Sequence, residues 1–240
     1  MSFVKFENVY KRYKMGEITI NAADGVSFEI EKGEFAVIVG ASGAGKTTIL
    51  NMLGGMDTCD EGKILVDGKD VAAFNKKQLT TYRRYDIGFV FQFYNLVNNL
   101  TAKENVELAT QICSHASQPE EVLKKVGLED RMSQPVGLLS GGQRQALTLM
   151  MATFNPPKLL LLDEHTAALD PATAEKVLTL TKSIVSENNL TCLMITHNMQ
   201  SALELGNRTI MMHGGNIIFD AEGEERSKLT VQDLLGKFKE

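Results

Sequence analysis

The chain has 240 residues, enough for one large or two small domains with a core that needs no disulfides. Its 25 Lys and Arg against 30 Asp and Glu give a net charge of -5, which excludes a broad basic surface for nucleic acid and leaves only local basic patches open. The three cysteines, Cys59, Cys113 and Cys192, form no C-x-x-C pair and have no histidine cluster nearby, which argues against a disulfide framework or a zinc site and favours a reducing cytosol. No apolar run approaches the roughly 18 to 20 residues that span a bilayer, and the N-terminus lacks a signal-peptide core, so we expect any membrane association to come through a partner.

Two strands are expected at the start of the chain. Apolar and polar residues roughly alternate over residues 3–9 and 26–30, which is typical of strands with one exposed face. Tyr13 lies between them. Two interpretations of this residue stay open: a side chain that stacks on an adenine, or one that packs against a strand end.

The most informative stretch follows at Gly40-Ala41-Ser42-Gly43-Ala44-Gly45-Lys46-Thr47, which satisfies the phosphate-binding pattern G-x-x-x-x-G-K-[ST]. An apolar run at 34–39 predicts a buried strand before it, and apolar residues at helical spacing over 47–56 predict a helix after it. Glycines let several backbone N–H groups converge on a polyphosphate at the positive end of that helix. Lys46 would reach the β and γ phosphates, and the Thr47 hydroxyl would bind Mg²⁺. The pattern therefore predicts a nucleoside triphosphate site.

The middle of the chain changes from strands to helices. Apolar runs over 62–66 and 87–91 predict two strands, the second ending at Gln92, which by itself is typical of an ordinary loop. From about 101 to 137 the pattern is helical and contains no strand, beginning with a capping box at 101–104. We therefore expect a single domain over 1–240, with an α/β core at 1–100 and 155–240 and a helical subdomain inserted at about 101–154.

A second helix start that suits an anion follows in the run Leu139-Ser140-Gly141-Gly142-Gln143. Ser140 is a good N-cap, the two glycines expose backbone N–H groups, and residues 143–154 are expected to be helical. Many helices begin in this way, so the run alone is weak evidence for a site. Asp170, directly before a proline, is predicted to cap a further helix.

Polar residues then follow two apolar strands at their carboxyl ends, where ligands bind in parallel α/β sheets. After the strand at 159–162, Asp163 suits a Mg²⁺ contact and Glu164 suits the polarisation of an attacking water, although two acids also end many strands. After the strand at 190–195, His197 is placed to contact a γ-phosphate.

The order of these motifs resembles that of the ATP-binding subunit of an ABC transporter along essentially the whole chain. The corresponding elements are the Walker A motif at 40–47, the Q-loop at Gln92, the signature motif at 139–143, the Walker B motif ending at Asp163 and Glu164, the D-loop at Asp170 and the switch histidine at His197. The resemblance implies an α/β fold, a P-loop NTPase of the ABC ATPase type, with a mixed sheet core, an N-terminal antiparallel β part and an inserted helical subdomain. It also puts Tyr13 where the family has its adenine-stacking aromatic.

The resemblance further implies a mechanism. Two subunits sandwich two ATP molecules with Mg²⁺, each bound by the Walker A motif of one subunit and the signature motif of the other. Glu164 would orient or deprotonate water, and His197 would stabilise the γ-phosphate. The residues implied for catalysis are Glu164, His197, Gln92 and Lys46, and those implied for Mg²⁺ are Thr47, Gln92 and Asp163. The residues implied for nucleotide binding are Tyr13, Gly40, Ser42, Gly43, Ala44, Gly45, Lys46, Thr47, Thr48, Ser140, Gly141, Gly142, Gln143 and Asp170.

Two features depart from the family pattern, and neither removes a catalytic group. His165 stands where the family usually has proline after the catalytic glutamate, and residues 144–151 differ from the common Arg-Val-Ala-Ile-Ala-Arg-Ala type. Residues from Tyr13 to about Glu107 resemble the lipoprotein-release and macrolide-efflux branch. The part from Leu139 onward resembles ATPases assigned to tryptophan/tyrosine-type uptake, which predicts a natural mosaic or an engineered chimera.

The leading function is an ATPase that powers a membrane transporter. Its expected partners are a second copy of itself or a homologous ATPase subunit, and a transmembrane permease, with no nucleic acid. It would lie in the cytoplasm, on the inner face of the cell membrane through that permease. A regulatory or mechanotransducing ATPase acting on a membrane partner shares every motif and stays open, whereas a soluble ABC ATPase of DNA repair or translation is disfavoured because the chain has no long coiled-coil insertion and no second cassette.

The stretch 91–97 clusters large apolar side chains beside Gln92. We expect Phe93, Tyr94 and Leu96 to form a docking surface, because a loop of a soluble monomer is normally polar. The resemblance favours the same interpretation, with a short cytoplasmic helix of the permease as the occupant. The alternative is that these side chains pack inward beneath the helical subdomain.

Overall fold

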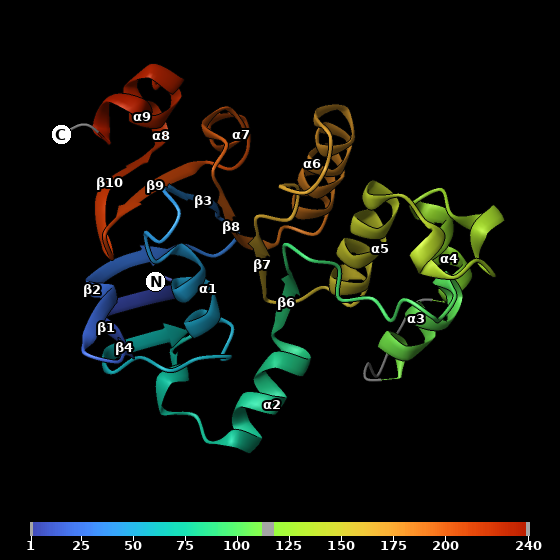
Figure 1. Cartoon of the computed structure of the whole chain (residues 1–240), viewed down its shortest axis with the longest axis horizontal. Helices are drawn as coiled ribbons and strands as arrows, with labels where there is room; N and C mark the ends of the chain where they lie inside the picture. The colour runs from blue at the N-terminus through green and yellow to red at the C-terminus, as the bar shows by residue number, and fades with distance from the viewer. Residues whose placement is uncertain (1, 112–117, 239–240) are drawn as a thin grey trace. The chain divides into compact units, whose positions relative to one another are not determined.

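The computed structural model describes residues 2–111 and 118–238, so Cys113 lies outside the described residues. The chain forms two compact units, one from Met1–Arg83 with Thr191–Glu240 and the other from Arg84–Leu190 (Figure 1). The predicted boundaries of the helical subdomain, at about 101–154, stay a prediction. Within residues 2–111 and 118–238, no helix is long and apolar enough to cross a membrane.

An antiparallel sheet opens the first unit, as predicted for the N-terminal part. β1 (Val4–Met15) pairs with β2 (Ile18–Ile30) on one side and with β4 (Glu61–Val66) on the other. A tight turn leads from β4 into the short β5 (Lys69–Asp70), which pairs back onto it. This sheet contributes the Tyr13 side chain to the candidate site.

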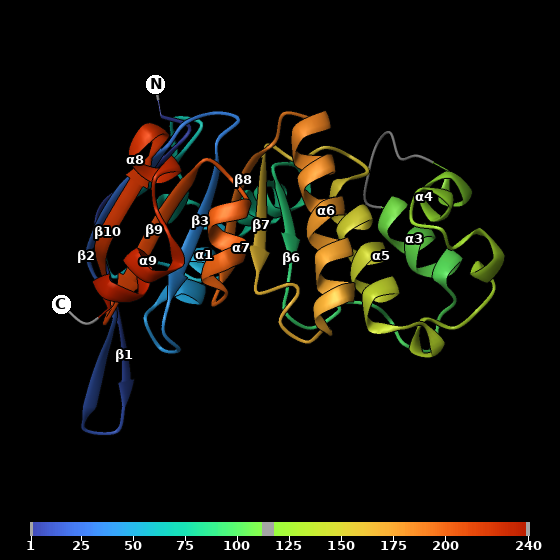
Figure 2. The ribbon, with the colours of Figure 1, turned by 90° about the horizontal axis from the view of Figure 1, so that it is seen from above.

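The hairpin of β1 and β2 is longer than the strands expected at 3–9 and 26–30. Backbone pairing continues to Met15 and Ile18, whereas residues 13–21 are all exposed and therefore lose the alternation that marks a half-buried strand. Figure 2 shows the hairpin tip, at the β1 label, extending beyond the other strands of its unit. Tyr13 thus belongs to β1 and does not lie in a connection between strands.

The second sheet of this unit is built around β3 (Phe35–Gly40), whose six residues are all buried. β8 (Thr191–Thr196) and β9 (Arg208–His213) pair with β3 in parallel, and β10 (Asn216–Glu222) pairs antiparallel with β9. Continuous apolar runs are typical of such covered parallel strands, and the strands predicted at 34–39 and 190–195 are confirmed to within one residue. The α-helices that lie entirely within the unit are α1 (Lys46–Leu53), α7 (Met199–Glu204), α8 (Gly223–Ser227) and α9 (Val231–Lys237), and a 3₁₀ turn lies at Val71–Ala73.

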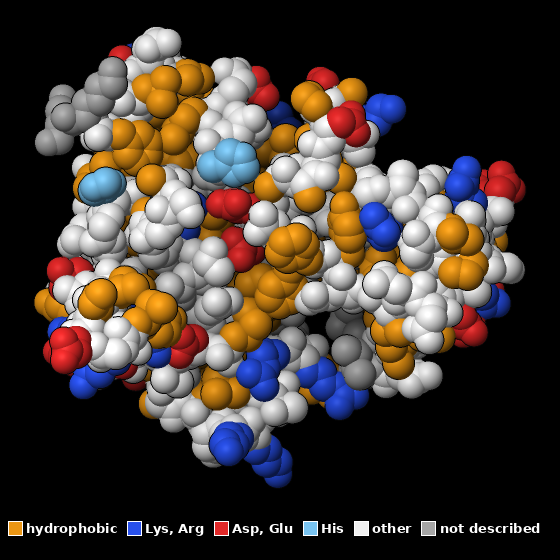
Figure 3. All heavy atoms as spheres, viewed as in Figure 1, with side chains coloured by type: hydrophobic (Ala, Val, Ile, Leu, Met, Phe, Trp, Pro, Cys, Tyr) orange, Lys and Arg blue, Asp and Glu red, His pale blue; other side chains and the backbone are white. Residues whose placement is uncertain are grey.

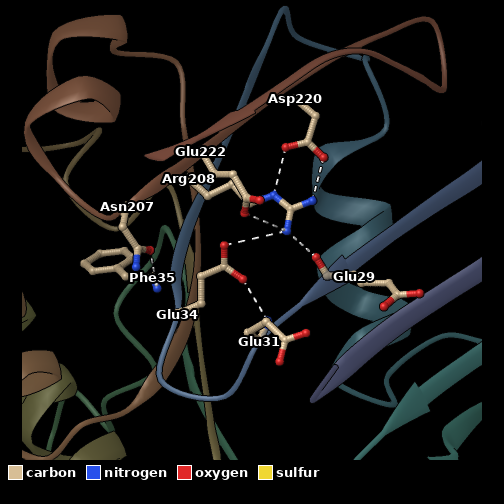
Figure 4. A network of polar contacts seen from close by, with 8 residues as sticks. All are labelled: Glu29, Glu31, Glu34, Phe35, Asn207, Arg208, Asp220 and Glu222. Carbon is tan, nitrogen blue, oxygen red and sulfur yellow. Dashed lines mark hydrogen bonds and ion pairs between the residues drawn. The ribbon is translucent and has the colours of Figure 1, made fainter. Parts of the chain in front are cut away.

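A network of charges fixes the amino end of β3 (Figure 4). Arg208, at the start of β9, donates from Nη2 and Nε to the Asp220 carboxylate at 2.6 and 2.8 Å. Its Nη1 lies 3.6 Å from the Oε1 of Glu34, which is buried and also accepts from the backbone N–H of Glu31. The hydrogen bond to Asp220 raises the pKa of the Arg208 guanidinium. A buried carboxylate is stable only with such partners, so Glu34, directly before β3, stays paired with Arg208 at the start of β9. The network thereby holds the two strands together at the end opposite Gly40.

The second unit combines a short parallel ladder with helices. β6 (Ile87–Val90) pairs in parallel with β7 (Leu159–Asp163), whose first four residues are fully buried leucines. The described residues between 101 and 137 contain no strand, as predicted, and one isolated bridge joins Thr101 to Pro135. The helices are α3 (Ala102–Thr110), α4 (Pro119–Lys125), α5 (Gly141–Thr153) and α6 (Pro171–Glu187), with 3₁₀ turns at Glu129–Arg131 and Val136–Leu138.

Helix caps that depend on local sequence are confirmed. Thr101 and Glu104 form the predicted capping box of α3, with the Thr101 hydroxyl accepting from the Glu104 N–H and the Glu104 carboxylate accepting from the Thr101 N–H. The helix α2 (Lys76–Tyr85) was not predicted from the sequence. Its residues are mostly polar and only Tyr82 is buried, so the segment lacks the apolar periodicity by which a helix is recognised.

Candidate functional site

The phosphate-binding run forms a sharp turn from β3 into α1. Gly45 is the N-cap of α1 with φ 98°, a left-handed value that favours glycine. A Cβ built on Gly45 would lie 2.0 Å from the carbonyl oxygen of Ala22, and one on Gly40 would lie 2.4 Å from that of Met212. Neighbouring backbone therefore leaves no room for a side chain at either glycine, and at Gly45 the left-handed turn requires glycine as well.

The side chains of this loop differ in exposure. Lys46 is only 6% exposed, and its Nζ donates to the carbonyl oxygens of Gly40 and Ala41 at 2.9 and 3.0 Å. Ala44 is buried, Thr48 is half-buried, and Ser42 in the loop and Thr47 at the start of α1 are exposed. Lys46 thus lies folded along the loop, and the hydroxyl side chains face outward from it.

Two further predicted residues belong to the same unit as this loop. In the parallel pairing of β3 with β8, Val39 lies opposite Thr196, so the exposed His197 follows at the same sheet edge as Gly40. Tyr13 is 37% exposed on β1, and its hydroxyl donates to Asp57 Oδ2 at 2.6 Å. The first unit therefore carries the loop, the histidine and the aromatic.

The second unit carries the glutamine and the two acids. Val90 of β6 lies opposite Leu162 of β7, so Gln92 and the pair Asp163 and Glu164 leave the same edge of this ladder. All three side chains are half-buried. Glu164 has φ 44°, a left-handed value that is uncommon for a non-glycine residue other than Asn or Asp.

His165, the residue that departs from the family pattern, is buried. Its Nε2 lies 3.0 Å from the Thr181 hydroxyl of α6, and that hydroxyl also donates to the carbonyl oxygen of Val177. Because a hydroxyl has one proton to donate, the Nε2 of His165 must carry the hydrogen between them. Burial lowers the pKa of His165 to about 4, so the ring is neutral at pH 7. His165 therefore attaches the loop after β7 to α6.

The signature run begins α5 two residues earlier than the helix predicted at 143–154. Ser140 and Gln143 form a capping box, which puts Gly141 and Gly142 in the first helical turn. A Cβ built on Gly141 would lie 2.8 Å from the Tyr94 hydroxyl and 3.0 Å from a methyl of Leu169. A Cβ on Gly142 would lie 2.2 Å from the Thr173 methyl. Both glycines are therefore contact points within this unit.

Asp170 caps α6 beside this contact, as predicted. Its carboxylate accepts from the backbone N–H of Thr173 at 3.1 Å, and hydrogen bonds from Thr173 lower the pKa of Asp170. A cavity of about 380 Å³ adjoins the start of α5, and the positively charged Lys125 and Lys176 are among the residues that line it. The cavity is lined by Lys125, Val126, Ser140, Gly142, Gln143, Ala146, Thr173, Lys176, Val177 and Leu180.

The apolar stretch after Gln92 divides between surface and core. Phe93 and Val97 are 73% and 41% exposed, whereas Leu96 is 8% exposed. Tyr94 is half-buried, with the guanidinium carbon of Arg144 4.6 Å from its ring centroid. The expectation that all of Phe93, Tyr94 and Leu96 form a docking surface is wrong for Leu96, which packs inward from a segment without regular secondary structure.

The local basic patch that composition left open lies on α2. Figure 3 shows Lys and Arg side chains gathered at the place of this helix, and Lys76, Lys77, Arg83 and Arg84 are exposed there. Elsewhere on the face drawn, the two signs of charge are interspersed. In the part of the chain that the structure describes, no cluster of three or more His, Cys, Asp or Glu residues is arranged to hold a metal ion.

Comparison with known proteins agrees with this geometry. The family model for "ABC transporter" matches residues 23–167. A tyrosine transport ATP-binding protein of Clostridioides difficile is 39% identical over 230 residues that cover 90% of each chain. This chain belongs to the ABC transporter family. The dimeric structure of the ATP-binding cassette MJ0796 bound to ADP and phosphate matches with a TM-score of 0.82 and 38% identity, over 91% of this chain and 98% of that one.

Family membership identifies the chain as an ABC ATPase with the cassette fold, as predicted from its motifs. A macrolide export ATP-binding/permease protein of Brucella abortus is also 36% identical over 90% of this chain, which spans 34% of that protein. Relatives named for tyrosine transport and for macrolide export thus each match nearly the whole length of this chain. The mosaic or chimeric origin stays a prediction.

Gly142 provides a test of the contact with α6. Gly142→Ala should lower the melting temperature of the protein, because overpacking a close contact costs about 1–3 kcal/mol. Thr173→Ser in the same chain removes the methyl that the new Cβ meets and should restore most of the loss, as followed by thermal unfolding. Gly236→Ala, in α9, is the matched control because its Cβ would meet nothing within 4 Å. An unrescued double variant would contradict the contact.

Proposed function

We propose that this ABC ATPase binds ATP with Mg²⁺ and hydrolyses it as one half of a dimer that drives a membrane transporter. The observation that carries the proposal is the phosphate loop: β3 ends at Gly40, Gly45 turns the chain into α1, and the buried Lys46 lies along the loop backbone. A helix start of this kind binds phosphate through its first N–H groups and its dipole. Ser42, Gly43, Ala44, Thr47 and Thr48 complete the cradle, and Tyr13 stacks on the adenine.

The Mg²⁺ ligands of the protein are proposed to be Thr47, Gln92 and Asp163. Each offers a hard oxygen, and such a small donor set fits Mg²⁺, which keeps water and phosphate oxygens among its ligands. When bound, the ion offsets the charge of the β and γ phosphates. Gln92 would in addition report the state of the γ-phosphate to the partner.

Glu164 is proposed to orient and deprotonate the attacking water, and His197 to contact the γ-phosphate. The strained backbone at Glu164 supports a functional position, since such strain persists where the surroundings hold a side chain in one direction. The neighbouring His165 is attached to α6 through Thr181, which restricts the loop that carries Glu164.

The signature run is proposed to contact the nucleotide of a second subunit, either a second copy of this chain or a homologous one. Ser140, Gly141, Gly142 and Gln143 begin α5 beside a cavity with two lysines, which suits the charge of a polyphosphate. Asp170 would lie in the same dimer contact. The MJ0796 cassette is named as dimeric, which supports this arrangement.

The membrane partner is proposed to be a permease, which would hold the ATPase at the inner face of the cell membrane. Relatives are named for tyrosine transport, methionine import and macrolide export, so similarity supports transport as the class and selects no substrate. The same names do not favour a regulatory or mechanotransducing ATPase, which would use the same site without translocation.

Glu164→Gln tests the hydrolytic role. The variant should retain ATP affinity but lose turnover by on the order of 10² to 10⁴-fold, the usual contribution of general-base assistance. It should also accumulate an ATP-bound dimer, measured by light scattering after gel filtration. Glu175→Gln, an exposed acid of α6, is the matched control. Equal hydrolysis rates for Glu164→Gln and the parent would remove Glu164 from this role.

Lys46→Ala tests binding separately from catalysis. The ammonium contacts phosphate oxygens in the ground state as well as in the transition state, so ATP affinity itself should fall, by on the order of tenfold or more. Isothermal titration calorimetry measures the effect, and Lys76→Ala, on the exposed face of α2, should bind as the parent does. Unchanged affinity in Lys46→Ala would refute the phosphate cradle.

Phe93→Ser tests permease docking. Phe93 is largely exposed, so the variant should keep the melting temperature and ATP binding of the parent while it copurifies less with the proposed permease. Leu96→Ser should instead lower the melting temperature, since that side chain is buried. Intact copurification of Phe93→Ser would show that docking uses another surface.

A further inference from the structure

The Tyr13 ring is held by Asp57, which belongs to none of the motifs, and by Thr48, which directly follows the phosphate-binding run. Its hydroxyl donates to Asp57 Oδ2 at 2.6 Å and shares a further hydrogen bond with the side chain of Thr48. Thr48 lies in the first turn of α1, and Asp57 lies in the loop that connects the far end of α1 to β4. The aromatic side chain on β1 is thereby attached to the phosphate-loop helix near its beginning and beyond its end.

Lys11 completes this cluster. Its Nζ donates to Asp57 Oδ1 at 2.7 Å and to the carbonyl oxygen of Thr58 at 2.8 Å, and its side chain is 10% exposed. The same Nζ lies 5.1 Å from the centroid of the Tyr13 ring, within the range of a cation–π contact. Asp57 therefore accepts from Tyr13 on one carboxylate oxygen and from Lys11 on the other.

The charges of this cluster support each other. Burial opposes the ionisation of Asp57, but hydrogen bonds from Lys11 and Tyr13 outweigh it and lower the pKa of Asp57. Burial and the hydrogen bond to Asp57 together raise the pKa of Tyr13, so its hydroxyl keeps the proton that it donates. Hydrogen bonds to an ionised partner are roughly twice as strong as neutral ones. The ring is thus firmly oriented although its part of the hairpin is exposed.

We propose that Asp57, held by Lys11, is a positioning residue that fixes the Tyr13 ring as the platform for the nucleotide base. This inference rests on the proposed stacking role of Tyr13. A ring that is already ordered loses less side-chain entropy when a base stacks on it. Since Thr48 and Asp57 belong to α1 and its following loop, the base platform and the phosphate loop are attached to one helix.

The experiment compares ADP with pyrophosphate, which offers phosphates without a base, by calorimetry on the full chain. Tyr13→Ala should weaken ADP binding by on the order of tenfold, the usual contribution of one stacked base. Asp57→Ala should weaken it by about three- to tenfold. Both variants should bind pyrophosphate as the parent does. The double variant should lose no more than Tyr13→Ala alone, because Asp57 acts through the ring.

Glu61→Gln is the matched control. Glu61 pairs with Arg12 of the same hairpin at 2.7 Å and does not contact Tyr13, so neither affinity should change. Tyr13→Phe, which removes only the hydroxyl, should reproduce the loss of ADP affinity and serves as a second variant if Asp57→Ala does not fold.

The possible failures are distinguishable. If Tyr13→Ala binds ADP normally, the stacking role itself is wrong, and the anchor falls with it. If Tyr13→Ala is weakened but Asp57→Ala and Tyr13→Phe are not, the stacking role stands and the anchor is overturned. Equal losses for ADP and pyrophosphate in Asp57→Ala, or a base-dependent loss in Glu61→Gln, would also overturn it, since either result indicates a general disturbance of α1 or of the hairpin.

Discussion

The parallel pairing of β3 with β8 and β9 is the constraint on which the first unit depends. It aligns Val39 with Thr196 and Gly40 with Met212, so the phosphate loop and His197 leave one sheet edge together. The same pairing brings the carbonyl oxygen of Met212 so close to Gly40 that no side chain fits there. At the other end of the strands, Arg208 and its carboxylates prevent β3 and β9 from shifting against each other. The loop that is proposed to present several N–H groups to a phosphate is thus built on a fixed register.

In the second unit the two signature glycines have a packing role besides the binding role proposed for them. Gly141 receives Tyr94, two residues after Gln92, and Gly142 receives Thr173, whose N–H is capped by Asp170. The glutamine segment, the start of α5 and the start of α6 therefore share one set of contacts. A displacement of any one of these segments shifts the other two, because close-packed contacts transmit small displacements.

In the proposed site, the base and the phosphates are bound by different kinds of interaction. The phosphates meet backbone N–H groups and an ammonium, whereas the base meets one aromatic ring on an exposed hairpin. The cluster of Lys11, Asp57 and Tyr13 orients that ring through charge-assisted hydrogen bonds, in place of the apolar packing that a core residue would have. The ring can therefore be exposed to solvent and still keep one orientation.

Motifs that depend on local backbone were predicted well. The capping box at Thr101, the N-caps at Ser140 and Asp170 and the turn at Gly45 follow from residues within a few positions of each other, and the buried runs of β3, β7 and β8 follow from composition and length. Family membership followed from the order of these motifs. The length of the hairpin was missed because alternation marks a strand only where one face is buried.

The amino-acid sequence by itself determined the α/β class and the phosphate loop, since their signals lie in local spacing and apolar periodicity, and the order of its motifs carried the resemblance to the family. Only the tertiary structure decided that Leu96 is buried while Phe93 is exposed, that His165 joins Thr181, and that Asp57 holds Tyr13 from 44 positions away. No periodicity in a sequence records these contacts. They arise when strands and helices far apart in the chain pack together and bring polar groups within hydrogen-bonding distance of each other.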